Sequence, residues 1–422
     1  MPFDRTAVGR RTVLSAVGTA GIAGLTGKGG ATRGSLARGD EPGAGSDEPA
    51  IVPDGVERIG RTFEYHLELG LHHGAQLSVW EDGELVADLA DGVDGPDGDE
   101  VTDDSRFLLF SCTKPYAAAC LHVLADHGEI GFDDRVVDYW PEYAESGSPK
   151  AETTIRHVLS HQAGIPAVDV DETPELWDDP REIDCAVEEA DLAFEPGETA
   201  QYHVFSFGWI IAGLVRRIDG RRIDRFAREE VFEPLGMDRT HIGLPEDEPD
   251  DVATLVGFEP FDRVGEPEPI VGYTTEEAAA EFNREDVQRS VVPGATGVGT
   301  AGDLARFYAC YVNGGELEGT RLLETETVDE AAAPQAEVGP EGGVGTAQRY
   351  GLGFQLGGTV PDRHGVPDPA ATYGHAGLGS SISWADPEDG LAFAYVTNGI
   401  RDAYEHDVRM ATMGETARAE SR

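Results

Sequence analysis

The tetrapeptide Ser111-Cys112-Thr113-Lys114 places a hydroxyl nucleophile and an amine three residues apart. An apolar run, RFLLF, precedes it at 106–110, and a helical pattern follows it. If Ser111 begins that helix, the Lys114 amine stands beside its hydroxyl, because residues three apart share a helical face. A neutral amine there can take the serine proton, which requires burial or nearby positive charge to lower the lysine pKa. The positive helix N-terminus would favour an oxyanion at Ser111.

Lysine is so rare in this chain that its position carries information. The chain has 32 Lys plus Arg residues, and only Lys28, Lys114 and Lys150 among them are lysines. Lys28 lies in a candidate leader, and Lys150 lies in an expected loop near Gly147. A lysine that merely solvates a helix surface would more naturally be arginine in this composition. The lysine at 114 therefore indicates a chemical role.

Further stretches of the chain accompany the serine–lysine motif. They are TIRHVLSHQAGIP (154–166), VFEPLGMDRT (231–240), GVGTAGDLARF (297–307) and GHAGLGSSISWADP (374–387). Together they resemble the serine β-lactamase and penicillin-binding-protein superfamily, in its esterase-like branch of family VIII carboxylesterases and class C β-lactamase relatives. The resemblance implies a β-lactamase/transpeptidase-like α/β fold, in which an antiparallel sheet is flanked by helices and carries an inserted all-helical domain. It also implies an active site in the cleft between the two parts.

Tyr202 lies in the stretch GETAQYHVFSFGW, at the place of the family's tyrosine motif. The resemblance implies that its phenol sits beside the serine and shares general acid and base work with Lys114. A tyrosine with an ordinary pKa of about 10 is a poor base at neutral pH, so this role needs a cationic neighbour or a proton relay. Deacylation by the same pair is a hypothesis. The alternative for Tyr202 is a buried aromatic that anchors the following helix.

His375-Ala376-Gly377 resembles the third motif of the family, which reads H-x-G in the esterase branch. The resemblance implies that it lies on an edge strand lining the cleft. The backbone amides of Ser111 and Leu378 would then form the oxyanion hole. A histidine that only packs in a strand is the alternative for His375.

Two departures from the β-lactamase pattern bear on the substrate. Where such enzymes read Y-x-N, this chain reads Tyr202-His203-Val204, so the asparagine amide that binds an acylamino side chain is missing. His375 replaces the lysine that attracts the carboxylate of penicillins and peptides. We therefore predict hydrolysis of small carboxylic esters through an acyl-enzyme on Ser111. The alternatives are a β-lactamase or D-aminopeptidase/DD-peptidase acting on an amide, and a non-catalytic binding protein on the same fold.

Other kinds of site find little support in the sequence. The G-x-S-x-G elbow of α/β-hydrolases does not occur. His157 and His161 lie four apart without the glutamate of a zinc protease motif, so we interpret them as packing and capping residues. No C-x-x-C pair, Walker loop or Rossmann fingerprint occurs, so we expect no metal and no cofactor. The four cysteines are interpreted as buried thiols.

The elements that must position these residues follow from hydrophobic patterning. Alternation over 75–92 around Asp82-Gly83 predicts a β-hairpin, and strand patterns return over 350–399. Strands at both ends imply one sheet built from residues of both ends of the domain, with a helical region inserted into it. We therefore expect a hydrolase domain over 51–422. Its sheet subdomain spans about 51–110 and 345–422, and its helical subdomain spans about 111–344.

Helical periodicity dominates the inserted region. The predicted helices span 114–128, 154–161, 207–218, 223–230 and 302–313. The segment 242–295 is acidic and rich in proline, and it is expected to form long surface loops.

Residues 1–50 do not resemble the rest of the chain. Arg10-Arg11 precedes an uncharged stretch at 12–27, which is too short and too rich in small residues for a spanning helix. We interpret 1–50 as a twin-arginine export signal with a flexible linker. This implies the twin-arginine export machinery as a partner and a secreted or cell-envelope location. A disordered tail on a cytoplasmic protein is the alternative.

The charge balance excludes several partners. The chain of 422 residues has 80 Asp plus Glu against 32 Lys plus Arg, a net charge of −48. Attraction to nucleic acid or to anionic membranes needs a basic face, so neither is expected as a partner. The acid is spread along the whole chain, and 40% of the residues are hydrophobic, which indicates a folded halophilic protein. At about 1 M salt the Debye length is roughly 3 Å, so self-repulsion is screened.

Overall fold

The computed structural model describes residues 57–96, 98–261, 272–340, 342, 346–358 and 371–421. Contacts divide the chain into Met1–Pro49 and Ala50–Arg422, and all the described residues belong to the second unit. The predicted export signal and linker at 1–50 lie outside the described residues. Within the described part, no helix is both long enough and apolar enough to cross a membrane.

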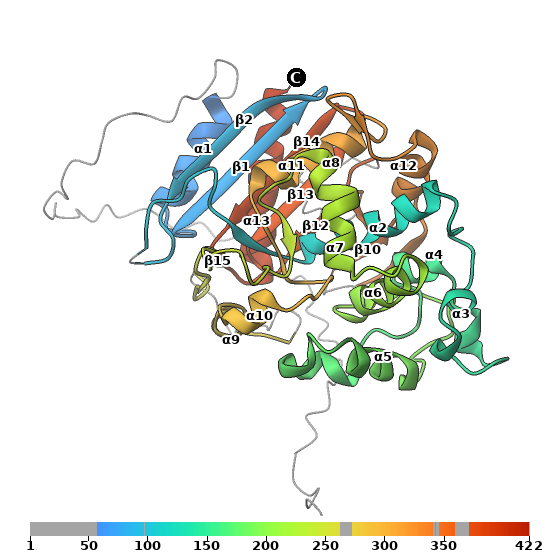
Figure 1. The fold of residues 1–422 in the computed structure, drawn as a ribbon. Helices are drawn as coiled ribbons and strands as arrows, with labels where there is room; N and C mark the ends of the chain where they lie inside the picture. Colours follow the sequence, from blue (N-terminus) through green and yellow to red (C-terminus); the bar gives the residue numbers. More distant parts are fainter. Residues whose placement is uncertain are drawn as a thin grey trace, which may run out of the picture. The chain divides into compact units, whose positions relative to one another are not determined.

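An antiparallel sheet forms the centre of the described unit (Figure 1). Among the described residues it has eight strands, in the order β2-β1-β14-β13-β12-β11-β10-β9. Their bounds are β1 Gly74–Glu81, β2 Glu84–Gly92, β9 Ala336–Val338, β10 Gln348–Tyr350, β11 Gln355–Leu356, β12 Tyr373–Gly377, β13 Ser381–Asp386 and β14 Leu391–Thr397. The pairing of β1 with β14 joins the two ends of the domain, as the sequence predicted.

The predicted hairpin is confirmed. Strands β1 and β2 pair up to Glu81 and Glu84, so Asp82 and Gly83 form a two-residue turn. Both turn residues have positive φ, 50° and 80°. That conformation matches the twist of the flanking strands and favours the Asp-Gly pair found here.

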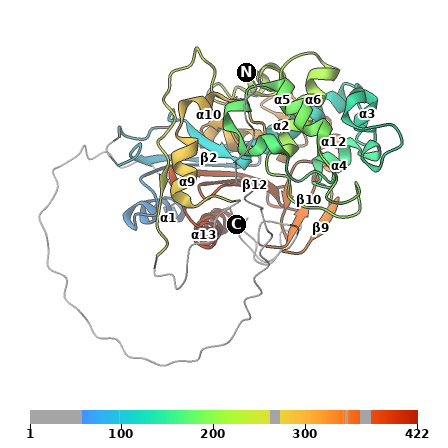
Figure 2. The same cartoon turned by 90° about the horizontal axis from the view of Figure 1, so that it is seen from below.

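The helices cover both faces of the sheet and form the inserted region. Their bounds are α1 Glu57–Glu68, α2 Lys114–Asp126, α3 Val136–Tyr139, α4 Ile155–Leu159, α5 Pro180–Glu189, α6 Ser206–Ile218, α7 Ile223–Ala227, α8 Glu233–Leu235, α9 Thr275–Phe282, α10 Glu285–Arg289, α11 Ala301–Val312, α12 Thr325–Ala332 and α13 Ala403–Glu420. The paired helices α1 and α13 lie together on one side of the sheet (Figure 2). Helix α11 packs against β1, β13 and β14.

Side-chain alternation along β14 shows how the two faces are filled. Leu391, Phe393 and Tyr395 share a core with Met410 and Met413 of α13. The residues between them are Ala392, Ala394 and Val396, and they belong to the core that contains α11. Large side chains thus meet the α1/α13 pair, while small ones let α11 approach the sheet closely.

Helix α2 lies at the centre of the helical region. Its residues from Lys114 to Leu124 are all buried, and it packs against α6 and α7. A helix that is apolar on all sides requires such a central place. A small sheet precedes α2 in the chain, because its strand β3 leads into the helix through residues 111–113. Its strand order is β3-β6-β4, and it consists of β3 Phe107–Phe110, β6 Gly297–Gly299 and β4 His241–Ile242. The shorter pairs are β5 Val256–Gly257 with β15 Gly399–Ile400, and β7 Glu316–Leu317 with β8 Thr320–Arg321.

Three expectations from the sequence need correction. The loop segment 242–295 contains α9 and α10, and α9 begins with a capping box between Thr274 and Glu277, a signal that was present in the sequence. The subdomain boundary at 344 is too late, because β9 already pairs with β10 in the main sheet. A strand of three residues is too short to show alternation. Cys185 is exposed, since it faces away from the buried Ile183 and Val187 of α5, whereas the other three cysteines are buried.

Candidate active site

Ser111 lies at a sharp connection between β3 and α2. Phe110 has φ 48° and ψ −131°, a conformation that is strained for any residue with a side chain. Ser111–Thr113 form a 3-10 turn, and α2 begins at Lys114, the first residue of the helix predicted over 114–128. Ser111 therefore lies in the turn that leads into the helix. The Thr113 hydroxyl donates to the Phe110 carbonyl at 2.5 Å and accepts from the Gly297 amide at 2.8 Å. These bonds hold the strained connection in place.

Lys114 stands beside Ser111, as the spacing of the motif predicted. Its Nζ lies 3.2 Å from Ser111 Oγ, 2.7 Å from the Val204 carbonyl oxygen and 2.9 Å from the Gly294 carbonyl oxygen. The side chain is completely buried, and burial lowers the pKa of Lys114 to about 7. Cys112 and Asp171 act in the opposite direction and raise this pKa. A buried amine with this pKa can exist in its neutral form at physiological pH.

Tyr202 is brought to the same amine from the segment before α6. The Lys114 Nζ lies 4.9 Å from the centroid of the Tyr202 ring. The ring also contacts His161, with centroids 4.8 Å apart, and shares a small buried cluster with Tyr350. The Tyr202 amide donates to the Gly342 carbonyl at 2.9 Å. The tyrosine predicted from the motif is therefore anchored in contact with Lys114.

His157 and His161 have the packing and capping places that the sequence predicted. His157 forms a capping box with Thr154 at the start of α4. His161 adopts φ 61°, and its Nδ1 accepts from the His203 amide at 3.1 Å. Burial holds the pKa of His161 well below its ordinary value, so the ring next to Tyr202 is neutral.

The end of β12 reaches the serine turn from the sheet. Cys112 Sγ donates to the His375 carbonyl at 3.1 Å, and the rings of His375 and Tyr202 lie 6.0 Å apart. A Cβ at Gly377 would collide with the Leu109 carbonyl and with Ser381 Oγ, so only glycine fits there. Half-buried Leu378 follows directly.

The expectation that this motif lies on an edge strand is corrected by the sheet order. Strand β12 lies between β13 and β11. However, β11 has only two residues and pairs with Tyr373 and Gly374. Within the described part of the chain, residues 375–377 pair only with β13. No strand there pairs with the side of these three residues that faces away from β13, so this half of β12 is an edge.

The sequence did not reveal the two backbone carbonyls that hold Lys114. In the sequence Val204 is only a departure from Y-x-N, and Gly294 falls in the segment 242–295 for which surface loops are predicted. A Cβ at Gly294 would lie 2.9 Å from the Val204 oxygen and 3.3 Å from Lys114 Nζ, so the site needs a glycine there. Backbone acceptors have no side-chain signature in a sequence.

Asp171 was also missed. Its carboxylate accepts from Trp209 Nε1 at 2.9 Å and from the Val168 amide at 3.0 Å. Burial raises the pKa of Asp171 to about 6. It is the carboxylate whose charge acts on Lys114, and no spacing in the sequence connects the two residues.

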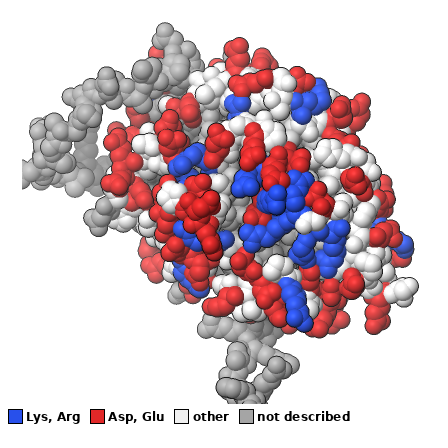
Figure 3. Space-filling model, in the orientation of Figure 1, with Lys and Arg blue, Asp and Glu red and all other residues white. Residues whose placement is uncertain are grey.

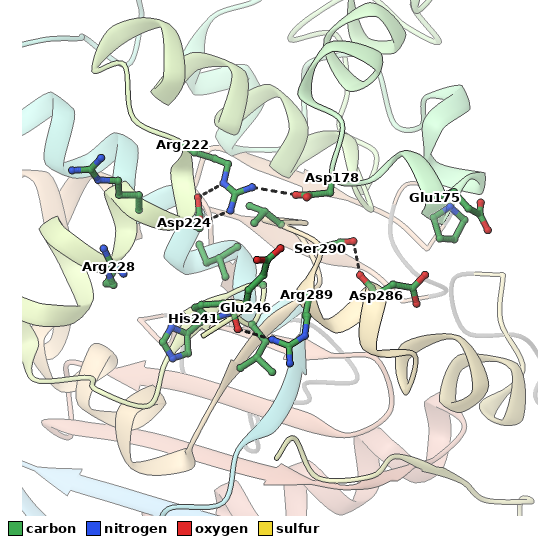
Figure 4. Close-up of a pocket in the computed structure, with 17 residues that line it drawn as sticks. Glu175, Asp178, Arg222, Asp224, Arg228, His241, Glu246, Asp286, Arg289 and Ser290 are labelled. Atoms are coloured by element: carbon green, nitrogen blue, oxygen red, sulfur yellow. Dashed lines mark hydrogen bonds and ion pairs between the residues drawn. The ribbon is translucent and has the colours of Figure 1, made fainter. Parts of the chain in front are cut away.

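A separate hollow of about 640 Å³ lies outside this group (Figure 4). Its lining includes Arg222, Arg289, His241 and Glu246, but none of the predicted site residues. Arginines gather on this face among many acidic residues (Figure 3). Arg222 is held between Asp224 and Asp178, so its charge is compensated. Among the described residues, no group of three or more His, Cys, Asp or Glu could hold a metal ion.

Comparison with known proteins identifies the family of the chain. A family model described as Beta-lactamase matches residues 61–413. The chain belongs to the beta-lactamase family. It is 33% identical over 355 residues to the esterase/beta-lactamase LipL of Mycobacterium tuberculosis, covering 78% of this chain and 77% of that protein. It is 30% identical over 361 residues to penicillin-binding protein 4 of Amycolatopsis lactamdurans, covering 82% and 87%.

Solved structures of this beta-lactamase family share the fold. A family VIII carboxylesterase superposes with a TM-score of 0.76 at 26% identity, over 87% of this chain and 99% of that one. A penicillin-binding protein homologue from Caulobacter crescentus gives 0.75 at 31% identity, over 89% and 100%. The family and these relatives are serine hydrolases, and this chain is a serine hydrolase as well. The predicted α/β fold and family are confirmed.

Proposed function

We propose that the protein hydrolyses small carboxylic esters through an acyl-enzyme on Ser111. The observation that carries this proposal is the set of three contacts around Lys114 Nζ. Carbonyl oxygens can only accept hydrogen bonds, so Val204 and Gly294 each take one N–H group. A neutral amine has two N–H groups and one lone pair. Its lone pair is then left for Ser111, whose hydroxyl donates to it.

The reaction follows from this arrangement. Ser111 Oγ attacks the ester carbonyl carbon while its proton passes to Lys114 Nζ. The amides of Ser111 and Leu378 stabilise the oxyanion of the tetrahedral intermediate. The C–O bond to the alcohol then breaks, and the alkoxide receives the proton through the Lys114 and Tyr202 pair. Water attacks the acyl carbonyl carbon and loses a proton to the same pair. The bond between the acyl carbon and Ser111 Oγ then breaks, Oγ takes that proton back, and the carboxylic acid leaves.

Two features favour esters over β-lactams or peptides. Val204 stands where the asparagine of Y-x-N would bind an acylamino group, and its apolar side chain cannot donate such a hydrogen bond. His375 stands in place of a lysine that would attract a carboxylate. Among the relatives, LipL is described as both esterase and beta-lactamase, and a solved neighbour is a carboxylesterase. The penicillin-binding relatives keep β-lactamase or D-aminopeptidase/DD-peptidase activity as the second candidate.

Two assays test this proposal. Turnover of p-nitrophenyl butyrate by the wild type, absent in Ser111→Ala, is the expected result, with little turnover of nitrocefin. Rapid nitrocefin hydrolysis without ester cleavage would favour the second candidate. A fluorophosphonate probe should label Ser111 in the folded protein at high salt. Failure to label would indicate a non-catalytic binding protein on the same fold.

We also propose that the protein is exported and works in concentrated salt. The net charge of −48 and the near absence of lysine support the salt requirement, and Arg10-Arg11 with the following uncharged stretch supports twin-arginine export. Thermal unfolding measured between about 0.1 and 3 M KCl should show stability rising with salt, because screening weakens carboxylate repulsion. A melting temperature that is independent of salt would contradict this proposal.

A further inference from the structure

The turn between β12 and β13 decides where the Leu378 amide points. Gly377 pairs with Ser381, so residues 378–380 form a three-residue loop. Within it the Ser380 amide donates to the Gly377 carbonyl at 3.4 Å. The C=O and N–H of a trans peptide point in opposite directions, so this bond turns the Leu378 N–H out of the loop. Whatever fixes the loop therefore fixes the direction of that donor.

The carbonyl of Gly379, at the tip of the loop, is held by two donors. The Arg401 amide donates to it at 3.0 Å, and Arg409 Nη2 donates to it at 2.7 Å. The same Arg409 nitrogen donates to the Gly399 carbonyl at 3.0 Å. Gly379 has φ 64°, and a Cβ there would lie 2.8 Å from Ile400 Cγ2. The loop thus rests on residues 399–401, with the guanidinium as its clamp.

Arg409 is a buried cation whose hydrogen bonds go to neutral groups. It is 3% exposed on α13, and its Nη1 contacts the Leu71 carbonyl and His72 Nδ1, both at 3.2 Å. Within the described residues it forms no ion pair. The nearby Glu405 pairs instead with Arg401. Burying an unpaired charge is unfavourable, so a residue of this kind needs a specific use for its donors.

We propose that Arg409 is a positioning residue for the oxyanion hole. Its hydrogen bonds within the described part of the chain go to Leu71, His72, Gly379 and Gly399 and not to Ser111. By holding the Gly379 carbonyl, Arg409 fixes the conformation of the β12–β13 turn. In that conformation the Leu378 N–H points toward the place of the substrate carbonyl oxygen, which becomes the oxyanion. This inference rests on the proposed function, in which that amide stabilises the oxyanion. Nothing in the sequence motif at 375–377 indicates that Arg409, a helix residue 30 positions after Gly379, acts on the turn that follows the motif.

Arg418 provides a matched control. It is also buried at 3% exposure on α13, but it pairs with Asp386 and donates to Thr372 Oγ1 at 3.0 Å, away from the turn. Arg409→Met and Arg409→Lys are compared with Arg418→Met and Arg418→Lys in the full chain at high salt. Three quantities are measured for each variant: kcat and KM for p-nitrophenyl butyrate, the inhibition constant of butylboronic acid, and the melting temperature.

The Arg409 variants should lose roughly ten- to hundredfold in kcat with KM changed by less than about threefold, since a misplaced oxyanion donor costs less than a deleted one. The boronate, which forms a tetrahedral adduct on Ser111, should weaken in parallel. The Arg418 variants should lower the melting temperature while kcat stays near wild type. Unchanged kcat and boronate affinity in Arg409→Met, or equal losses in the Arg418 variants, would overturn the proposal.

Two safeguards keep the test decisive. Wild-type ester turnover is measured first and tests the proposed function alone, whereas the Arg409 proposal is judged on the ratio of variant to wild type. If both Arg409 variants fail to fold, Thr397→Val decides, because the Thr397 hydroxyl holds the next carbonyl of the loop, that of Ser380, at 2.9 Å. A lower kcat at unchanged KM supports the turn clamp, and an unchanged kcat refutes it.

Discussion

Lys114 and Lys150 are the two lysines of the described residues. Their surroundings differ: those of Lys114 suit the base of the proposed mechanism, whereas those of Lys150 suit a residue that caps the end of α5. Both are buried. The Lys150 Nζ donates to three carbonyls that end α5, those of Val187 at 2.7 Å, Glu188 at 2.9 Å and Ala190 at 2.9 Å. The Lys114 Nζ has two carbonyls and a serine hydroxyl.

The difference lies in the third partner. Three carbonyls require three N–H groups, so Lys150 must keep its proton, although burial lowers its pKa to about 8. With only two obligate acceptors, Lys114 can lose its proton without leaving a buried group unsatisfied. Both places also explain why lysine persists in a chain that otherwise uses arginine. A compact ammonium fits three converging acceptors, whereas a planar guanidinium does not.

The largest expected effect comes from exchanging the two lysines for arginine. Lys114→Arg should lower kcat by roughly 10⁴-fold, close to the loss in Ser111→Ala, because arginine cannot be deprotonated in the working range. Lys150→Arg should keep kcat within about threefold of wild type. Ester turnover by both variants at equal folded concentration measures this contrast. Comparable losses in the two variants would show that the distinction between base and cap is false.

The next effect concerns Tyr202. Tyr202→Phe keeps the ring beside Lys114 and removes only the hydroxyl, so a loss of roughly 10² to 10⁴ in kcat is expected from general acid and base catalysis. Steady-state ester kinetics measure it, with Tyr350→Phe, in the same buried cluster, as the control. A rate above half of the wild-type value would remove Tyr202 from the mechanism.

The pH dependence of activity and of stability should report the lowered pKa of Lys114. In the proposed mechanism the neutral form of Lys114 is the base, so kcat/KM should fall about tenfold per pH unit below about 7 and level off above it. Lys114 binds its proton less tightly in the folded state than in the unfolded chain, whose lysines titrate near 10.5. Stability contributed by this group therefore rises with pH between about 7 and 10.5 and is lowest below 7. Denaturation of Lys114→Met should lack this slope, and an unchanged slope would contradict the assignment.

Lys150→Met is expected to have the smallest effect on catalysis but a clear effect on stability. The three carbonyls at the end of α5 lose their donor, which should lower the free energy of unfolding by about 3 kcal/mol. Ester turnover per folded molecule should stay near wild type. Urea denaturation and kinetics on the same samples check both parts. A stability equal to that of the wild type would show that water replaces the lysine as a cap.

Much of the fold was readable from local patterns. The Asp82-Gly83 turn and the periodicity of α2, α6 and α11 produced elements within a few residues of their final bounds. The pairing of Ser111 with Lys114 followed from helical geometry alone, even though the first three residues form a 3-10 turn. In these cases the signal and the structure lie in the same short segment.

The rest depended on contacts between distant segments. The Val204 and Gly294 carbonyls approach Lys114 only after α6 and the 290–296 loop have packed around α2. The scarcity of lysine drew attention to Lys114, which the structure places beside Ser111, but it does not indicate that Lys150 is buried as well. Strand β9 and the half-edge of β12 depend on pairing partners of two or three residues, which are too short to show a pattern.

The pairing of β1 with β14 also determines when, during synthesis, the chain can complete its fold. Ala75 finds its partner only at Thr397, and the turn that carries Leu378 rests on residues 399–401 and on Arg409. A chain emerging from the ribosome therefore carries Ser111 and Lys114 for most of its synthesis without the turn that holds the Leu378 amide, the proposed oxyanion donor. Such distant contacts also make folding slow. Hydrolytic activity should appear as a late, all-or-none event, once the final helix has docked.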